Sequence, residues 1–168
     1  LLSQAQSGNP EAFGLIYDEY SVRIYKFIFV RTGHKEIAED LLSDTFIKAW
    51  LKISHVSSSK SLSSWLYQVA KNNVIDHYRS KKQTVSLDDV GELEDIVNLV
   101  EEASLNFDQK RILDTLNQLP KDQALVIRYK FFEDLSNEEI AAIMNKTEVA
   151  VRVLQHRAIA KLKNLLNK

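Results

Sequence analysis

Apolar residues recur at intervals of three and four along most of this chain, and that spacing favours helices over strands. Only four glycines and two prolines occur among 168 residues, and the alternation of polar and β-branched residues typical of strands is scarce. An apolar content of 45% is enough for one ordinary core or two small ones. The sequence therefore predicts an all-α protein.

Strong helical patterns occur in the first third of the chain. Residues 10–30 predict a first helix or pair of helices with an apolar stripe, and Gly33 follows as the C-terminal cap. Residues 35–53 form the second helix. Its expected core arc consists of Ala38, Leu42, Phe46, Ala49, Trp50 and Ile53.

The opposite arc of this second helix has a mixed composition. It combines the carboxylates of Asp40 and Asp44 with the aliphatic side chains of Ile47 and Leu51. A purely solvated face has no need of these aliphatic residues. The arc is therefore either a surface for a partner or a packing contact with a neighbouring helix.

A further helix is predicted over Trp65–Lys82, after a Ser-rich loop at 54–64. One side holds Leu66, Val69, Ala70 and Asn73, and another side holds Gln68, Lys71, Asn72, Ile75 and Arg79. Amides can hydrogen-bond to base edges and cations can hold phosphates. The flanking rings of Trp65, Tyr67 and Tyr78 can stack on unpaired bases. This side is either a DNA-binding face or a solvated polar face.

Residues 104–168 predict a second helical unit. Pro120 stops its first helix, and the next helix covers 121–132. That helix is expected to turn inward the side chains of Leu125, Val126, Tyr129 and Phe132. Ser136 and Glu139 have the spacing of a capping box at the start of a short third helix.

The last helix of this unit begins after a tight turn at Asn145, with Thr147 as its N-terminal cap. A short helix, a turn and a longer helix form a helix-turn-helix pattern, although an ordinary helical hairpin has the same outline. The outward arc of the last helix holds Val149, Arg152, Val153, His156, Ala160 and Lys163, with Arg157 at its edge. A helix in a DNA major groove places base contacts first and phosphate contacts later, as this order of side chains allows.

Charge is distributed unevenly behind the small net charge of −1. Residues 55–82 carry five basic and one acidic side chains, residues 83–120 carry two and nine, and residues 121–168 carry nine and six. Two basic segments separated by an acidic one suggest two nucleic-acid contacts and a connector that DNA would repel. Within the acidic segment, residues 83–103 are either a linker or a docking segment that covers one of the basic faces.

Several classes of function find no support in the sequence. There is no cysteine, so disulfides and thiolate metal sites are excluded and a reducing compartment is expected. The four histidines are scattered singly, and no phosphate-binding glycine loop occurs, so we expect no catalytic site, no metal and no cofactor. No apolar run approaches the roughly 20 residues of a membrane span, and no signal-peptide pattern is present. Membrane insertion is therefore not expected.

Three motifs in order resemble the extracytoplasmic-function (ECF) group of bacterial sigma factors, group IV of the sigma-70 family. Residues 38–50, AEDLLSDTFIKAW, are similar to sigma region 2.2. Residues 65–79, WLYQVAKNNVIDHYR, are similar to regions 2.3 and 2.4. Residues 119–144 together with 151–162 are similar to region 4. The resemblance covers nearly the whole chain.

The resemblance implies an architecture and a function. Residues 1–82 would form the region 2 helical bundle, 83–103 a linker, and 104–168 the region 4 helix-turn-helix domain. Such proteins are not enzymes: they bind core RNA polymerase, recognise the −35 and −10 promoter elements and promote strand opening. A cytoplasmic bacterial protein is implied, with an anti-sigma factor as a further partner that would cover the two basic faces.

The resemblance also assigns residues to these partners. The β′ clamp helices of the polymerase would contact Asp40, Ser43, Asp44 and Ile47. The −10 element would contact Trp65, Lys71, Asn72, Asp76 and Arg79, and the loop 54–64 would hold a base flipped out of the stack. The −35 element would contact Val149, Arg152, Val153, His156, Arg157 and Lys163. The region 4 unit would also meet the flap of the β subunit.

The chain departs from the family pattern at three positions. Ser43 stands where glutamine is frequent, Leu62 where an aromatic residue is frequent, and Asn145 where glycine is common. The main alternative is a stand-alone helix-turn-helix regulator with an N-terminal dimerisation or sensing domain. It would explain residues 104–168 but would leave the polar side of 65–82 without a role. A small helical enzyme is the third alternative.

Overall fold

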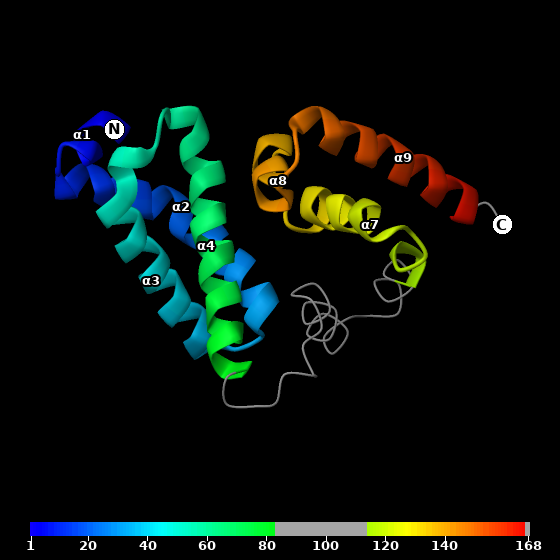
Figure 1. The fold of residues 1–168 in the computed structure, drawn as a ribbon, viewed down its shortest axis with the longest axis horizontal. Helices are drawn as coiled ribbons and strands as arrows, with labels where there is room; N and C mark the ends of the chain where they lie inside the picture. The colour runs from blue at the N-terminus through cyan, green and yellow to red at the C-terminus, as the bar shows by residue number, and fades with distance from the viewer. Residues whose placement is uncertain (83–113, 167–168) are drawn as a thin grey trace. The chain divides into compact units, whose positions relative to one another are not determined.

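A computed structural model describes residues 1–82 and 114–166 of the chain. The chain divides into two compact units, residues 1–101 and 102–168 (Figure 1). Every regular element within the described residues is a helix, which confirms the predicted all-α class. The predicted linker, 83–103, and the start of the helix before Pro120 lie outside the described residues.

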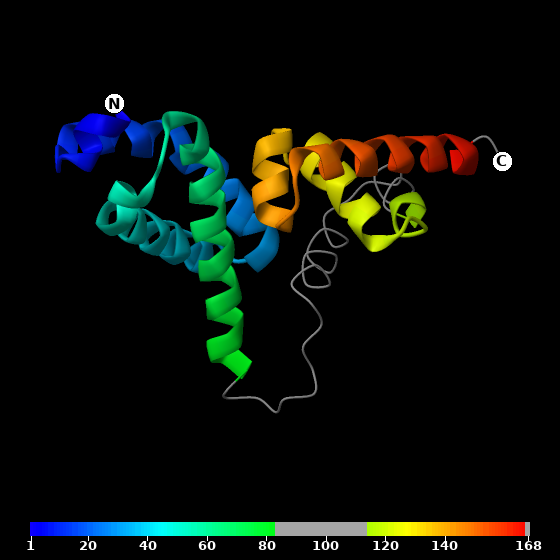
Figure 2. The same ribbon diagram turned by 45° about the horizontal axis from the view of Figure 1, so that its top comes forward.

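The first unit is a bundle of three long helices with a short helix at its N-terminus (Figures 1 and 2). The short helix is α1 (Leu2–Gln6), and the long ones are α2 (Pro10–Thr32), α3 (Lys35–Lys52) and α4 (Ser59–Lys82). Each long helix packs on the other two, and α1 lies against α2. The largest fully buried side chains here include Ile16, Ile24, Ile28, Leu66, Tyr67 and Val74.

Local signals define both ends of α2. The side chain of Asn9 accepts hydrogen bonds from the backbone N–H groups of Glu11 and Ala12, at 2.9 and 3.1 Å, and Pro10 occupies the first turn. Gly33 adopts the left-handed conformation with φ of 66°, and its N–H donates to the Phe29 carbonyl at 2.8 Å. The predicted cap at Gly33 is therefore confirmed.

The inward face of α3 differs in part from the predicted core arc. Ala38, Phe46 and Ala49 are buried as expected. Leu41 and Thr45, which the prediction omitted, are buried as well, whereas the expected core residue Trp50 is exposed at the edge of the bundle. The rings of Phe13 and Trp50 meet edge to face there, with centroids 5.0 Å apart.

The Ser-rich loop is shorter than predicted, because α4 begins at Ser59 rather than at Trp65. Leu62 is buried one turn before Leu66, so the apolar stripe of α4 extends further back than the loop prediction allowed. The hydroxyl of Ser61 accepts a bond from the N–H of Ser58 at 3.3 Å and donates to the Ser58 carbonyl at 2.9 Å. A short 3₁₀ turn, Ile53–His55, and three irregular residues, 56–58, make up the connection from α3 to α4.

The second unit contains the end of a helix at residues 114–116, then three further helices and a π-helical turn (Figures 1 and 2). These are α7 (Lys121–Ile127), the π-helix η2 (Arg128–Phe132), α8 (Asn137–Met144) and α9 (Glu148–Leu166). The helix α9 packs on both α7 and α8. One core cluster joins Leu116, Leu119, Ile127 and Ala158, and Ala124, Leu162 and Leu165 pack against it.

The prediction that Phe132 points inward is wrong. The backbone N–H of Glu133 donates to the Arg128 carbonyl at 3.2 Å, five residues back, so the last turn is wider than an α-helical turn. This wider turn moves Phe132 off the line of Leu125 and Tyr129, and the Phe132 side chain is 48% exposed. Leu135 is the next side chain to be buried.

Candidate nucleic-acid and polymerase interface

The mixed arc of α3 faces solvent. Asp40, Ser43 and Asp44 are exposed, and the aliphatic side chains of Ile47 and Leu51 are 58% and 71% exposed. Packing on a neighbouring helix of the first unit therefore does not explain the two aliphatic residues. The four residues assigned to the polymerase all lie on this exposed arc.

The polar stripe of α4 is accessible along one side of the helix. Gln68, Asn72, Asp76 and Arg79 are exposed, whereas the side chains of Trp65, Lys71 and Ile75 are partly buried. Asn72, Asp76 and Arg79 follow one another at intervals of four and three, so they lie on one face. This face combines an amide, a carboxylate and a guanidinium within two turns.

Two of the three rings expected beside this stripe are structural instead. Tyr67 is 1% exposed, and its ring meets that of Phe27 edge to face, with centroids 5.2 Å apart. The Tyr78 hydroxyl donates to the Arg31 carbonyl at 2.7 Å, at the end of α2, and partial burial raises the pKa of this tyrosine. The predicted stacking role is therefore wrong for Tyr67 and unsupported for Tyr78, whereas the ring of Trp65 is partly buried.

A buried polar network joins α3 to α4 directly behind the stripe. Asn73 is 3% exposed, and its amide Nδ2 donates to Thr45 Oγ1 at 2.9 Å. The Thr45 hydroxyl donates in turn to the Leu41 carbonyl at 2.6 Å, and the Lys48 ammonium donates to Asn73 Oδ1. The two bonds of Asn73 fix α4 against α3, the Thr45 bond to Leu41 lies within α3, and Asn72 is the neighbour of Asn73 along the chain. Sequence periodicity placed Asn73 on the same side as Leu66, Val69 and Ala70 but did not reveal its partners.

His77 lies at the edge of the same helix with an unpaired ring atom. Its Nε2 is buried and has no hydrogen-bond partner. Burial, and then the nearby charge of Lys81, lower the pKa of this histidine below its ordinary value of 6.5. The ring contacts that of Tyr78 edge to face, with centroids 5.4 Å apart. His77 is therefore neutral at pH 7 and packs as a ring rather than as a cation.

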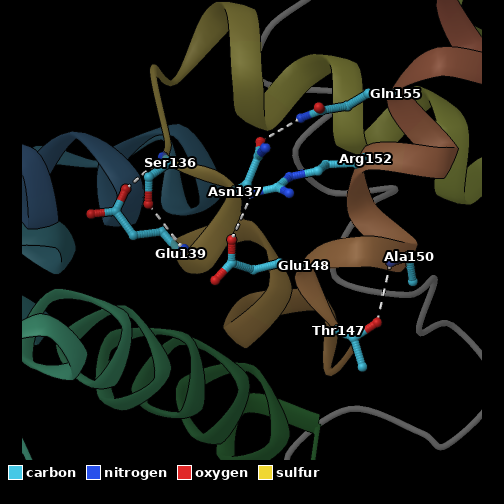
Figure 3. A network of polar contacts seen from close by, with 8 residues as sticks. All are labelled: Ser136, Asn137, Glu139, Thr147, Glu148, Ala150, Arg152 and Gln155. Carbon is cyan, nitrogen blue, oxygen red and sulfur yellow. Dashed lines mark hydrogen bonds and ion pairs between the residues drawn. The ribbon is translucent and has the colours of Figure 1, made fainter.

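The helix-turn-helix of the second unit is held by the predicted caps (Figure 3). The Ser136 hydroxyl accepts from the N–H of Glu139 at 3.1 Å, and the Glu139 carboxylate accepts from the N–H of Ser136 at 2.8 Å. Asn145 adopts the left-handed conformation in the turn, with φ of 53°. The Thr147 hydroxyl then accepts from the N–H of Ala150 at 3.2 Å. These bonds confirm the predicted capping box, the turn at Asn145 and the cap at Thr147.

Side chains on α9 divide into a buried and an exposed set. Val151 and Ala158 are fully buried. All six residues assigned to the −35 element are exposed: Val149, Arg152, Val153, His156, Arg157 and Lys163. The first three side chains lie in the first two turns of the helix, where a recognition helix meets base edges.

Two side-chain contacts set the start of α9 (Figure 3). Gln155 Nε2 donates to Asn137 Oδ1 at 2.8 Å and so ties α9 to the first turn of α8. Arg152 Nη2 lies 3.5 Å from Glu148 Oε2, one turn away, and both side chains are largely exposed. Such an exposed pair contributes little to stability, so breaking it to free the guanidinium costs little.

The described residues contain no group of three or more histidine, aspartate or glutamate side chains arranged to bind a metal ion. Within the same residues, no helix combines the length and apolar character needed to cross a membrane.

Two protein-family models match the chain, one for each unit. The model for sigma-70 region 2 matches residues 16–84. The model for sigma-70 region 4 matches residues 109–162. Both models match in the order that the motifs predicted.

Known relatives cover the chain almost from end to end. It is 33% identical over 170 residues to the ECF RNA polymerase sigma factor BldN of Streptomyces coelicolor. This alignment covers 99% of this chain but only 64% of BldN. It is 32% identical to the ECF RNA polymerase sigma factor SigM of Bacillus subtilis, with 91% of this chain and 94% of SigM covered.

A solved structure shows the same fold. The sigma factor RpoE of Bartonella quintana, in complex with the anti-sigma factor NepR, superposes with a TM-score of 0.58 at 22% identity. The match covers 94% of this chain and 98% of RpoE. With both sigma-70 region models matched in order, and about one-third identity to SigM along nine-tenths of the two chains, this chain belongs to the ECF sigma factors of the sigma-70 family.

Proposed function

We propose that this chain binds core RNA polymerase, recognises the −35 and −10 promoter elements and promotes strand opening. One observation carries the proposal. The faces of α3, α4 and α9 that we propose for these partners carry exposed side chains, and the opposite side of each helix is buried in its own unit. The proposal involves no catalytic residue and no cofactor.

The exposed arc of α3 supports the polymerase contact. Ile47 and Leu51 offer apolar area to a partner, and the carboxylates of Asp40 and Asp44 offer charge that a basic partner can neutralise. Ser43 lies between them, and its hydroxyl donates within the helix to the Glu39 carbonyl at 3.1 Å. The β′ clamp helices are the partner proposed for this arc, and the β flap is proposed for the second unit.

The exposed face of α4 supports contact with the −10 element. Asn72 can pair with a base edge, while Lys71 and Arg79 can hold the phosphate backbone. Trp65 is the ring available for stacking. Because α4 begins at Ser59, we propose that the flipped base is held by the connection before Ser59 rather than by the whole segment 54–64.

The exposed face of α9 supports contact with the −35 element. Arg152 can bind guanine through two hydrogen bonds, and Val149 and Val153 can meet thymine methyl groups. His156 lies next along this face. Arg157 and Lys163 lie further along the helix, where phosphate contacts follow.

Regulation by an anti-sigma factor is a further part of the proposal. The related structure of RpoE contains the anti-sigma factor NepR. In this chain, residues 55–82 and 121–168 are basic and carry exposed cations, so a protein with a complementary acidic surface could cover them. We place the protein in the bacterial cytoplasm, where RNA polymerase acts.

Binding to purified core RNA polymerase is the decisive experiment. The chain and core enzyme are mixed at moderate salt without DNA and separated by size. Stable co-elution, combined with weak duplex binding by the chain alone, supports the proposal. Absence of co-elution, together with tight duplex binding by a dimer of the free chain, would instead establish a stand-alone helix-turn-helix regulator.

A further inference from the structure

The N-terminal helix α1 is attached to the connection between α3 and α4. Gln6, its last residue, donates from Nε2 to the carbonyl of Ile53 at 3.1 Å and to the carbonyl of Val56 at 2.8 Å. These partners lie 47 and 50 residues away along the chain. Leu2 and Ala5 are buried and fix α1 to the bundle, so the helix that carries the Gln6 amide is itself anchored.

The two bonds bracket the segment that the proposed function assigns to a flipped base. The Gln6 amide donates to the carbonyl of Ile53, the first residue of the 3₁₀ turn, which also accepts from the N–H of Val56 at 3.1 Å, and to the carbonyl of Val56, the residue after the turn. Val56 is buried, while Ser54, His55, Ser57 and Ser58 are exposed. The segment therefore has two anchored backbone points and exposed polar side chains between and after them.

The two Gln6 bonds can preorganise the segment that receives the base. A base leaves the stack at a cost of a few kcal/mol, and the receiving site repays this cost best when its groups are already in position. Few backbone bonds hold a short irregular connection, so its conformation depends on contacts from outside. Here the Gln6 amide supplies two such contacts, beside the buried side chains of Ile53 and Val56 and the bonds between Ser58 and Ser61.

We propose that Gln6 is a positioning residue for the flipped base: by holding the carbonyls of Ile53 and Val56, it sets the conformation of residues 54–58 and thereby the base preference at one promoter position. The inference rests on the proposed function, since it requires that this connection receives a base. Gln6 itself need not touch DNA.

Gln6→Glu tests the inference with almost no change in side-chain shape. The new carboxylate accepts hydrogen bonds and cannot donate them, so it repels both carbonyls. Gln4→Glu is the matched control, because Gln4 lies on the same helix, is exposed and acquires the same charge. The wild-type chain and both variants are each reconstituted with core RNA polymerase and used to select from a single-stranded DNA library with a randomised segment. Sequencing gives the base preference at every position, and thermal unfolding of each chain is measured in parallel.

The expected result is a local change in the selected sequences. In Gln6→Glu the preference at one position falls about tenfold, which corresponds to the loss of roughly one net hydrogen bond, and other positions keep their preferences. Gln4→Glu selects the wild-type sequences. Equal preferences in the two variants would overturn the inference, and so would a uniform loss at all positions accompanied by a lower melting temperature. A wild-type chain that fails to bind polymerase or selects no sequence would instead refute the proposed function itself.

Discussion

Asn72 and Asn73 show at the scale of single residues how a helix gives neighbouring, identical side chains different roles. Asn72 is exposed on the proposed −10 face, whereas Asn73 is buried in the network with Thr45 and Lys48. We expect Asn73→Ala to lower the free energy of unfolding of the first unit by about 1–3 kcal/mol, because buried polar partners lose their bonds. Asn72→Ala should change it by less than about 0.5 kcal/mol.

Urea unfolding followed by tryptophan fluorescence measures this difference, because the two tryptophans, Trp50 and Trp65, both belong to the first unit. Binding of −10 single strands by the reconstituted holoenzyme should show the reverse order, with Asn72→Ala the weaker binder. Equal stability losses in the two variants would contradict the buried placement of Asn73.

His77 predicts a pH dependence of stability. The pKa of its ring is lowered in the folded state, so between that value and 6.5 the unfolded chain binds more protons than the folded chain. The contribution of His77 to stability is therefore complete above pH 6.5 and falls as the pH drops through this window. Comparing wild type with His77→Gln by urea unfolding from pH 8 to pH 5.5 isolates the effect. The variant should lose less stability on acidification; equal slopes would refute the explanation.

At the scale of secondary-structure elements, the π-helix η2 decides which aromatic residues of the second unit are buried. Tyr129 lies in the core, whereas Phe131 and Phe132 are exposed. We expect Tyr129→Ala to cost about 3 kcal/mol of stability, as large aromatic truncations in cores do. Phe132→Ala should cost less than about 1 kcal/mol. Hydrogen exchange at the backbone amides of α9 reports on this unit alone, and similar protection losses in the two variants would argue against the exposed position of Phe132.

At the scale of the whole molecule, the proposed function assigns polymerase binding to α3 and promoter binding to α4 and α9, and these faces can be tested separately. Asp44→Arg reverses a charge on the exposed arc of α3, and we expect it to weaken binding to core polymerase about tenfold or more, because a like charge then faces the partner. Asp18→Arg makes the same charge change on α2 and serves as the control. Duplex binding through the second unit should be unaffected by either substitution. Unchanged polymerase affinity in Asp44→Arg would remove this arc from the proposed interface.

Local sequence determined much of this protein. The helical period placed α2, α3 and the exposed arc of α9 but not α1 or the start of α4, and the caps at Gly33, Ser136 and Thr147 were identifiable from residue type and spacing. Such signals act between residues three or four apart, so they are complete in the sequence. For the same reason the residues of the mixed arc of α3 are identifiable from their spacing alone, although their partner is not.

Only the tertiary structure decided which of several chemically similar side chains pack or hydrogen-bond inside the first unit and which face solvent. Tyr67 and Tyr78 both carry rings that could stack on bases. In the structure Tyr67 packs on Phe27, and Tyr78 donates a hydrogen bond to the carbonyl of Arg31, 47 residues away. The bonds of Gln6 join positions 47 and 50 residues apart in sequence. Partners of this kind are chosen by the packing of whole helices, and a helical period, which repeats every few residues, contains no information about contacts across such distances.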